Sequence, residues 1–455
     1  MKTLLSKLSV LGILIAGLVF VLCPAPAGAA APSKIKADNT RLYNSVTGQA
    51  FTPRGANYVR LAKDADGVVY HSTFEPGKYK LTAVRDFLNQ LKLYKYNTVR
   101  VFIDPGSVNV NTAHGIGRGM GTYDTVYGPY MDNVASFVNE AAARGIYVLP
   151  SMDMFPQNTY YWVQVAGANA DGFSNTNVAG RNSDYMSRTH VMAKAEYMKQ
   201  FAQALISRVG ANESAILAYQ ADNEVFYETS QAPFHQLSGS VRPVDGLVYD
   251  MSKPADRQQA ADASMVVYSQ LIKQKLLEAS PNALMTMGFF TNLAVGKTSY
   301  NGLITSYCST NCQPGIDYRV PGRPSALSAW GKADFLDIHI YPDTNPFSLT
   351  KTLNSIEETW FQKPYIIGEF GALKSVYSNN ITTAANAMRD LQTATCNEGA
   401  KGWLFWTWDT TENLASQPLF FNMKDGQGRL NTSLSPIYRS NPCSASNTNI
   451  QYIRK

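Results

Sequence analysis

Eight short apolar runs, rich in β-branched and aromatic residues, alternate with stretches of helical period from residue 53 onward. In the first of these stretches, apolar side chains recur at the spacing of one helix face, at Leu81, Val84, Leu88 and Leu91. This alternation is typical of repeated strand–helix units whose strands form a parallel sheet. The expected strands cover residues 54–59, 98–104, 147–154, 215–224, 284–290, 335–341, 365–371 and 402–409.

Eight strand–helix units are the number that closes an α/β sheet into a (β/α)8 or TIM barrel. The alternative is a doubly wound open sheet, but no glycine-rich dinucleotide-binding or phosphate-binding loop follows any of the eight runs. A chain of 455 residues with 45% hydrophobic content can fill such a barrel as one unit. We therefore expect one TIM-barrel domain over residues 30–455, including the C-terminal tail, with long loops after strands three, four and five.

The first 29 residues have the composition of a secretory signal. Lys2 and Lys7 precede an apolar run over residues 8–22, and the small residues 27–29 complete an A-x-A cleavage pattern. The run is shorter than the roughly 20 residues that a membrane-spanning helix needs. We expect cleavage after Ala29, secretion to the extracellular space or the periplasm, and no stable membrane association of the mature chain.

Cleavage would leave four cysteines, Cys308, Cys312, Cys396 and Cys443, in an oxidising compartment. Four cysteines allow three connectivities, of which we favour Cys308 with Cys312 by proximity and Cys396 with Cys443 by default. A zinc site is disfavoured, because no C-x-x-C pair occurs and no histidine lies close in sequence to the four. We expect neither a metal nor a cofactor.

The net charge of +6 is spread along the chain without a basic run. An Arg/Lys stripe interleaved with aromatic residues, the electrostatic footprint of nucleic-acid binding, is missing. We expect a monomer that binds no nucleic acid.

Two glutamates stand where predicted strands end. Glu224 closes the fourth apolar run and Glu369 closes the seventh. In a TIM barrel the carboxyl ends of the strands surround the active-site mouth, so both side chains should point into it. Hydrolysis of a glycosidic bond uses two carboxyl groups, one that donates a proton to the leaving oxygen and one that is ionised.

At these strand ends the sequence resembles the clan A glycoside hydrolases, and glycoside hydrolase family 5 in particular, over residues 54–409. The motifs that carry the resemblance are Asp222-Asn223-Glu224, Gly368-Glu369-Phe370-Gly371 and His339-Ile340-Tyr341-Pro342. The resemblance implies a retaining β-glycosidase with Glu224 as general acid/base and Glu369 as nucleophile.

The same resemblance implies roles for four neighbours of the two glutamates. Asn223 would bind the sugar 2-hydroxyl, and His339 would orient the acid/base side of the site. Tyr341 would donate a hydrogen bond to Glu369, and the cation of Arg100 would favour the ionised form of Glu369.

Two tryptophans are further candidates for substrate binding, because aromatic rings stack on the apolar faces of pyranose sugars. Trp406 matches the aromatic platform under the cleaved sugar in the family, and Trp162 belongs to an aromatic cluster in the third loop. Val225 departs from the proline that often follows the Asn-Glu pair. The third strand lacks the usual histidine, and its Asp153 is expected to cap a turn.

The expected function is endo-acting hydrolysis of a β-1,4-linked polysaccharide, with β-mannan preferred to β-glucan because His-x-Tyr-Pro resembles the mannanase-like branch. A transglycosylase with the same covalent intermediate is the first alternative. A barrel that binds carbohydrate without cleaving it would lack a carboxylate, yet both glutamates are present. A metal-dependent hydrolase would need clustered ligands at strand ends, where only His339 qualifies.

Overall fold

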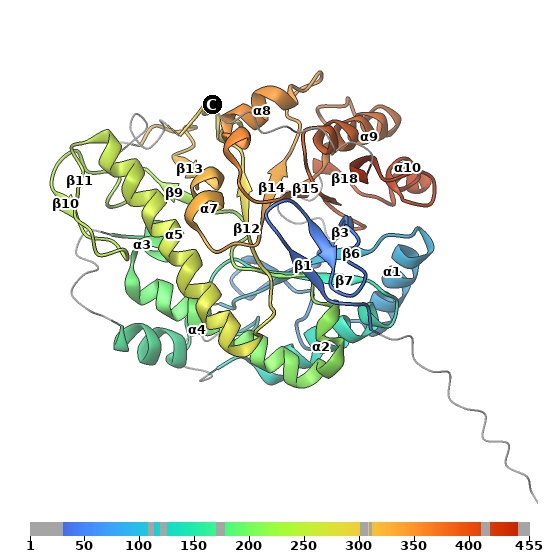
Figure 1. Cartoon of the computed structure of the whole chain (residues 1–455), viewed down its shortest axis with the longest axis horizontal. Helices are drawn as coiled ribbons and strands as arrows, with labels where there is room; N and C mark the ends of the chain where they lie inside the picture. The colour runs from blue at the N-terminus through green and yellow to red at the C-terminus, as the bar shows by residue number, and fades with distance from the viewer. Residues whose placement is uncertain are drawn as a thin grey trace, which may run out of the picture.

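Eight parallel strands close into a barrel, and the helices that connect them form an outer layer (Figure 1). This computed structural model describes residues 31–107, 113–118, 125–169, 178–300, 308, 312–410 and 419–444. The strands follow one another around the barrel in chain order, and the last pairs with the first. They are β3 (Arg54–Tyr58), β6 (Thr98–Ile103), β7 (Tyr147–Met152), β8 (Tyr219–Gln220), β12 (Met285–Phe290), β14 (Phe335–Ile340), β15 (Tyr365–Phe370) and β17 (Trp403–Phe405). The TIM-barrel prediction is confirmed.

Every predicted strand overlaps one of these, but the predicted ranges of the fourth and eighth strands are much longer than the observed strands. The fourth, expected over 215–224, is a ladder only at Tyr219–Gln220, preceded by a single bridge from Ile216 to Val148. Past Gln220 the backbone keeps hydrogen bonds to β12 but not to β7, and the carboxylate of Asp222 accepts a hydrogen bond from Arg181. The eighth, expected over 402–409, ends at Phe405, and the peptide bond between Trp406 and Thr407 is cis.

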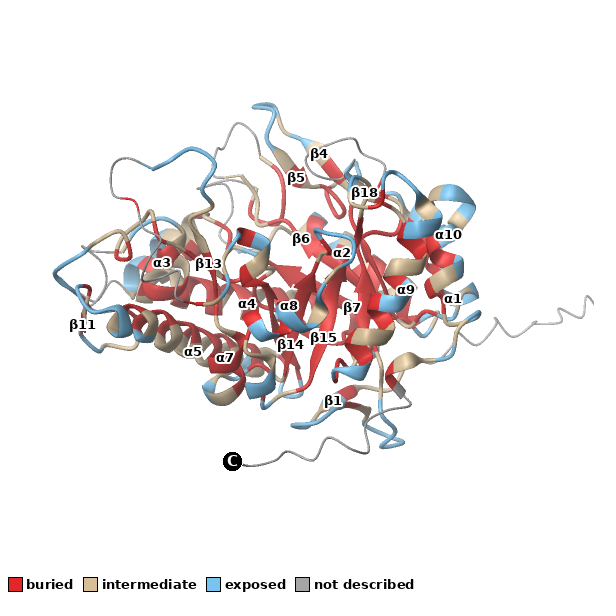
Figure 2. Cartoon of the chain, turned by 90° about the horizontal axis from the view of Figure 1, so that it is seen from above, coloured by how far each residue is buried: buried red, intermediate tan, exposed pale blue. Residues whose placement is uncertain are grey.

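The helices bury one face against the barrel and expose the other (Figure 2). In α1 the predicted apolar stripe is the buried one, with Val84, Phe87, Leu88 and Leu91 almost fully enclosed. Each such side chain contributes about 1.5–3 kcal/mol by leaving water. The helices are α1 (Leu81–Leu93), α2 (Gly128–Ala142), α3 (Arg181–Met186), α4 (Arg188–Val209), α5 (Pro254–Ala279), α7 (Pro324–Trp330), α8 (Leu349–Ser355), α9 (Ile381–Asn397) and α10 (Asp425–Leu434). Shorter turns are η2 (Thr159–Ala166), η3 (Gly210–Ala215), η4 (Asn292–Val295), η5 (Glu358–Trp360) and η7 (Pro442–Ser444).

The two ends of the barrel are closed differently. At the amino ends of the strands, the hairpin of β1 (Ile35–Ala37) and β2 (Leu42–Asn44) inserts Ile35 and Leu42 into a buried cluster with Leu149 and Leu217. Four further two-stranded sheets lie outside the barrel: β4 (Leu61–Lys63) with β5 (Val69–His71), β9 (Phe226–Glu228) with β13 (Arg319–Pro321), β10 (Ser240–Val241) with β11 (Tyr249–Asp250), and β16 (Ala372–Leu373) with β18 (Phe420–Phe421). Figure 2 shows β4, β5 and β18 at the end opposite β1. The hairpin therefore seals one end, and the long loops gather at the other.

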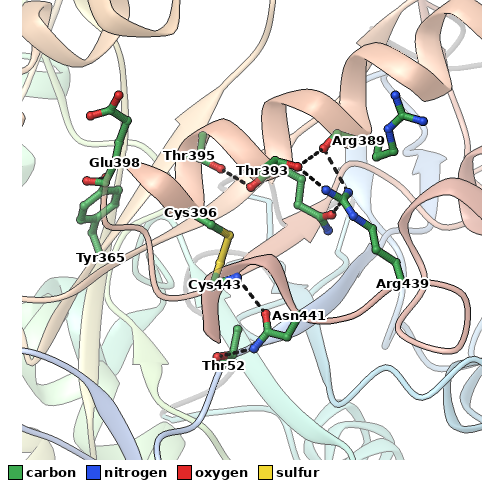
Figure 3. Close-up of a disulfide and its surroundings, with 11 residues drawn as sticks. Thr52, Tyr365, Arg389, Thr393, Thr395, Cys396, Glu398, Arg439, Asn441 and Cys443 are labelled. Carbon is green, nitrogen blue, oxygen red and sulfur yellow. Dashed lines mark hydrogen bonds between the residues drawn. A yellow bond between two sulfur atoms is a disulfide. The ribbon is translucent and has the colours of Figure 1, made fainter. Parts of the chain in front are cut away.

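Both predicted disulfides are present. Cys396 in α9 bonds to Cys443 in η7, which ties the C-terminal segment to the barrel (Figure 3). Next to this bond, Asn441 donates a hydrogen bond from Nδ2 to Thr52 Oγ1 at 3.0 Å. The proposed signal segment and Cys23 lie outside the described residues. Within the described ranges, the structure has no helix that combines the length and the apolarity needed to cross a membrane.

The Cys396–Cys443 disulfide should stabilise the fold more than the Cys308–Cys312 disulfide. Their sequence separations are 47 and 4 residues, and a longer loop loses more conformational entropy in the unfolded chain. Replacing both members by serine should lower the free energy of unfolding by ~4 kcal/mol for the first bond and ~2 kcal/mol for the second. Urea unfolding of the two double variants measures this, and equal losses would contradict the loop-entropy origin.

Candidate active site

Glu224 and Glu369 open into one cavity at the carboxyl ends of the barrel strands. Glu369 lies near the end of β15, and Glu224 follows β8 on the far side of the mouth. The side chain of Glu369 is 5% exposed and that of Glu224 is 27% exposed. One oxygen of each, together with a ring nitrogen of His339, lie within 4.8 Å of one another. The cavity has a volume of about 410 Å³.

Both oxygens of Glu369 accept short hydrogen bonds. Arg100 Nη1 donates to Oε1 at 2.5 Å, and the Tyr341 hydroxyl donates to Oε2 at 2.6 Å. Charge-assisted bonds of this length are about twice as strong as neutral ones. The carboxylate is therefore fixed in one orientation, with its charge opposite the guanidinium.

Arg100 is fully buried. Its guanidinium donates hydrogen bonds to four side chains besides that of Glu369. Nε donates to Gln220 Oε1 at 2.7 Å, and Nη1 donates to Asn57 Oδ1 at 2.9 Å. Nη2 donates to Asn223 Oδ1 at 2.5 Å and to Ser151 Oγ at 3.2 Å. A buried cation is tolerated only when it is paired and its donors are satisfied. These partners therefore fix the position of the guanidinium beside Glu369.

Strand β14 contributes several side chains to the site, because side chains two residues apart on a strand point to the same face. Asp337 and His339 lie two residues apart on it, and Tyr341 follows at the same spacing, so all three project to one face. His339 Nδ1 lies 2.9 Å from Glu224 Oε1, at hydrogen-bond distance. Asp337 Oδ2 accepts from Gln220 Nε2 at 2.6 Å. This strand therefore connects the Glu224 side of the mouth to the Glu369 side.

The charges around His339 and Glu369 are strongly interdependent. Burial opposes protonation of His339, but the nearby carboxylates of Glu369, Asp337 and Glu224 outweigh it and raise its pKa to about 10. Burial raises the pKa of Glu369, while His339 and Arg100 oppose that rise. Arg100 thus favours the ionised carboxylate as expected from the sequence, but burial exceeds its effect. His339 is a cation at neutral pH, and its charge favours the ionised form of Glu369.

Glycines permit two close approaches that place these groups. An ideal Cβ on Gly288 in β12 would lie 1.8 Å from the carbonyl oxygen of Asn223, and one on Gly368 would lie 1.8 Å from Asp337 Oδ1. Neither distance is possible for a real side chain. The backbone of Asn223, next to Glu224, can therefore approach β12 this closely only because residue 288 is a glycine.

The two tryptophan candidates lie in different places. Trp406 is 9% exposed, lines the cavity and packs edge-on against Phe102, with ring centroids 5.6 Å apart. Trp162, in the π-helical turn η2, packs against His190 at 4.9 Å and Phe155 at 6.1 Å. It is not among the described residues that line the cavity, so its contact with a sugar stays a prediction.

A second polar network is formed around Asp222, two residues before Glu224. Arg181 Nη2 donates to Asp222 Oδ1 at 3.0 Å and to Asp153 Oδ1 at 3.1 Å, and Tyr185 donates to Asp222 Oδ2 at 3.0 Å. Burial raises the pKa of Asp222 to about 7, with Arg181 opposing the rise. We expected the carboxylate of Asp153 to cap a turn, but in the structure it accepts a hydrogen bond from Arg181 instead.

The site contains three buried polar residues that the sequence argument did not assign to it. Gln220 and Asp337 occupy apolar strands and bond to each other, and Asn57 bridges Arg100 to the backbone carbonyl of Gly368 at 3.0 Å. A polar residue inside an otherwise apolar strand was the signal that could have found all three.

The three groups that approach within 4.8 Å, Glu224, His339 and Glu369, are also the arrangement that a metal ion could use. Their charges argue against this. Arg100 already lies 2.5 Å from Glu369, and His339 is protonated at neutral pH. A divalent cation would have to displace that proton and sit beside the guanidinium, so the residues do not fit a metal centre.

The stability that protonated His339 provides should depend on pH. Its pKa in the folded chain is about 10, above the ordinary 6.5, so this stability is fully present below pH 6.5 and is lost as the pH rises through about 10. The difference in melting temperature between the wild type and His339→Gln should therefore narrow between pH 6.5 and 10. Thermal unfolding followed by circular dichroism measures it, with His235→Gln as the control. A constant difference would contradict the raised pKa.

Comparisons with known proteins show the fold. No protein-family model matches the sequence, and the comparison with curated proteins finds no match. The exo-β-1,4-mannosidase Op5Man5 from Opitutaceae bacterium strain TAV5 has a TM-score of 0.54 and 16% identity, over 90% of this chain and 62% of that one. This chain therefore spans less than two thirds of the mannosidase.

Two further solved structures are similar. The β-1,4-D-mannanase from Cryptopygus antarcticus has a TM-score of 0.50 and 15% identity, over 88% of this chain and 94% of that one. The endo-β-1,4-mannanase from Thermotoga petrophila has a TM-score of 0.51 and 13% identity, over 90% and 79%. The chain is thus a (β/α)8 barrel that shares the fold of these three enzymes.

Proposed function

We propose that the chain is a secreted retaining β-glycosidase of glycoside hydrolase family 5 that hydrolyses a β-1,4-linked polysaccharide. The observation that carries the proposal is the pair of carboxyl groups facing one cavity, with an oxygen of each within 4.8 Å. Retaining enzymes hold their carboxyl groups about 5–5.5 Å apart, whereas inverting enzymes need about 6.5–9.5 Å to admit a water. The short separation supports double displacement.

In the first step, Glu369 attacks the anomeric carbon while Glu224 protonates the leaving oxygen. The glycosidic C–O bond breaks and a glycosyl ester forms. Arg100 and Tyr341 hold the two oxygens of Glu369, so attack needs no reorientation. The acid role falls to Glu224, because both oxygens of Glu369 already accept short hydrogen bonds from Arg100 and Tyr341.

In the second step, Glu224 takes a proton from water, and the water oxygen attacks the anomeric carbon and releases Glu369. Asn223 supports both steps, because its Oδ1 accepts from Arg100 and its amide nitrogen is thereby left to donate to the sugar 2-hydroxyl. If a sugar hydroxyl replaces the water, the same intermediate yields transglycosylation, which is the alternative activity.

The cavity lining favours a neutral sugar. No lysine or arginine is among the described residues that line it, and its wall includes the rings of Phe102, Tyr341, Trp406 and Phe420. An anionic sugar would face Glu224 and Glu369 without a lining cation to offset them. The structurally similar enzymes from Cryptopygus antarcticus and Thermotoga petrophila are mannanases, which favours β-mannan over β-glucan, and we propose endo action on such a chain by a monomeric enzyme. The two disulfides support secretion.

The proposed activity predicts reducing ends from β-mannan, with less from cellulose or xylan. Glu369→Gln should lose at least a thousandfold in kcat, since an amide cannot form the ester. The fold should be kept, because the new amide oxygen can face Arg100 while its nitrogen faces the Tyr341 hydroxyl. Glu358→Gln, at the amino end of β15, is the matched control and should retain wild-type activity. Glu369→Gln within tenfold of the wild type would remove Glu369 as nucleophile.

Double displacement also fixes the stereochemistry of the product. Each of the two steps inverts the anomeric carbon, so the first-formed sugar should have the β configuration. Proton NMR of a fresh digest, recorded before mutarotation, distinguishes the anomers. An α anomer appearing first would contradict double displacement and indicate a single displacement by water, as in an inverting enzyme.

A further inference from the structure

We propose that His71, at the end of the hairpin β4–β5, binds the substrate by donating a hydrogen bond from Nε2 to a hydroxyl of the glycone, the sugar whose anomeric carbon is attacked. This inference rests on the proposed glycosidase function. It adds a specificity residue that lies outside every motif of the sequence argument.

The barrel topology places His71 on the glycone side. The hairpin follows β3, and β3 and its neighbour β17 lie across the closed strand order from β8, which precedes Glu224. Glu224 must contact the leaving-group oxygen, so the wall opposite it surrounds the sugar that stays on Glu369. His71 lines the cavity in that wall, together with Trp406 and Phe102.

The ring of His71 is held in place before any sugar binds. Its backbone N–H donates to Asp104 Oδ2 at 2.9 Å, and its imidazole stacks on Phe102 with centroids 4.3 Å apart and planes within 7°. The guanidinium of Arg100 lies 4.5 Å from the centroid of the same Phe102 ring. The position of His71 is thus coupled through one aromatic ring to the arginine that fixes Glu369. A preorganised donor of this kind loses little entropy on binding.

The hydrogen-bonding state of the imidazole identifies what it would bind. Nδ1 is buried without a partner, and no bond from Nε2 to another described residue is seen. Burial lowers the pKa of His71, so the ring is neutral near pH 7 and has one donor and one acceptor. Buried N–H groups without a partner are rarer than unpaired acceptors, which favours the tautomer with its proton on Nε2. That N–H then needs an oxygen acceptor, and a sugar hydroxyl is one.

Steady-state kinetics on the trisaccharide that the wild type cleaves, β-1,4-mannotriose or cellotriose, tests the inference. His71→Phe keeps a flat ring over Phe102 but removes the donor, and it should lower kcat/KM about tenfold, mainly through KM. His71→Gln restores an N–H donor and should recover most of that loss. His235→Phe is the matched control, because His235 is also a half-buried histidine with an unpaired Nδ1 but does not line the cavity. It should leave both constants unchanged.

Unchanged kcat/KM in folded His71→Phe would overturn the inference, as would a loss that His71→Gln fails to recover, because ring packing alone would then explain it. If His71→Phe melts well below the wild type, His71→Met makes the same comparison with a flexible side chain. A wild type that cleaves no oligosaccharide or polysaccharide would instead refute the proposed function.

Discussion

The buried guanidinium of Arg100 is the interaction on which the rest of the site depends. An arginine at the centre of a barrel costs several kcal/mol in lost hydration, and only a full set of partners offsets that cost. Its bonds to Asn57, Gln220, Asn223 and Glu369 provide this set, and they come from the first, fourth and seventh strand positions. One charge therefore fixes both Glu369, the proposed nucleophile, and Asn223, the residue that precedes the proposed acid/base.

The charge balance of the site follows from the same arrangement. Arg100 and protonated His339 face Glu369, Asp337 and Glu224, and of these five residues only Glu224 is appreciably exposed. Burial raises the pKa of Glu369, and the two cations limit that rise. Because the groups are coupled, their protons belong to the cluster as a whole. A site of this kind can pass one proton between a leaving group and water without gaining net charge, which is what the proposed double displacement requires.

The two sides of the mouth differ in character. On the side of Glu224, Asp222 lies two residues earlier in the chain and accepts a hydrogen bond from Arg181. On the opposite side, Phe102, Trp406 and the hairpin residue His71 form a mostly aromatic wall. Under the proposed mechanism, polar groups near Glu224 and aromatic rings across the cavity suit a substrate that is held by its sugar faces on one side and releases an oxygen on the other.

The sequence by itself determined the barrel, because the spacing of apolar residues that distinguishes strands from helices is a local property of short segments. It also located both glutamates, Arg100, His339, Tyr341, Asn223 and Trp406, which the structure brings together around one cavity. It did not reveal the roles of Gln220, Asp337 or His71, and it grouped Trp162 with the site although its described contacts lie elsewhere. These outcomes depend on which distant residues become neighbours. Arg100 and Glu369 are 269 positions apart, and only closure of the barrel brings the guanidinium to the carboxylate.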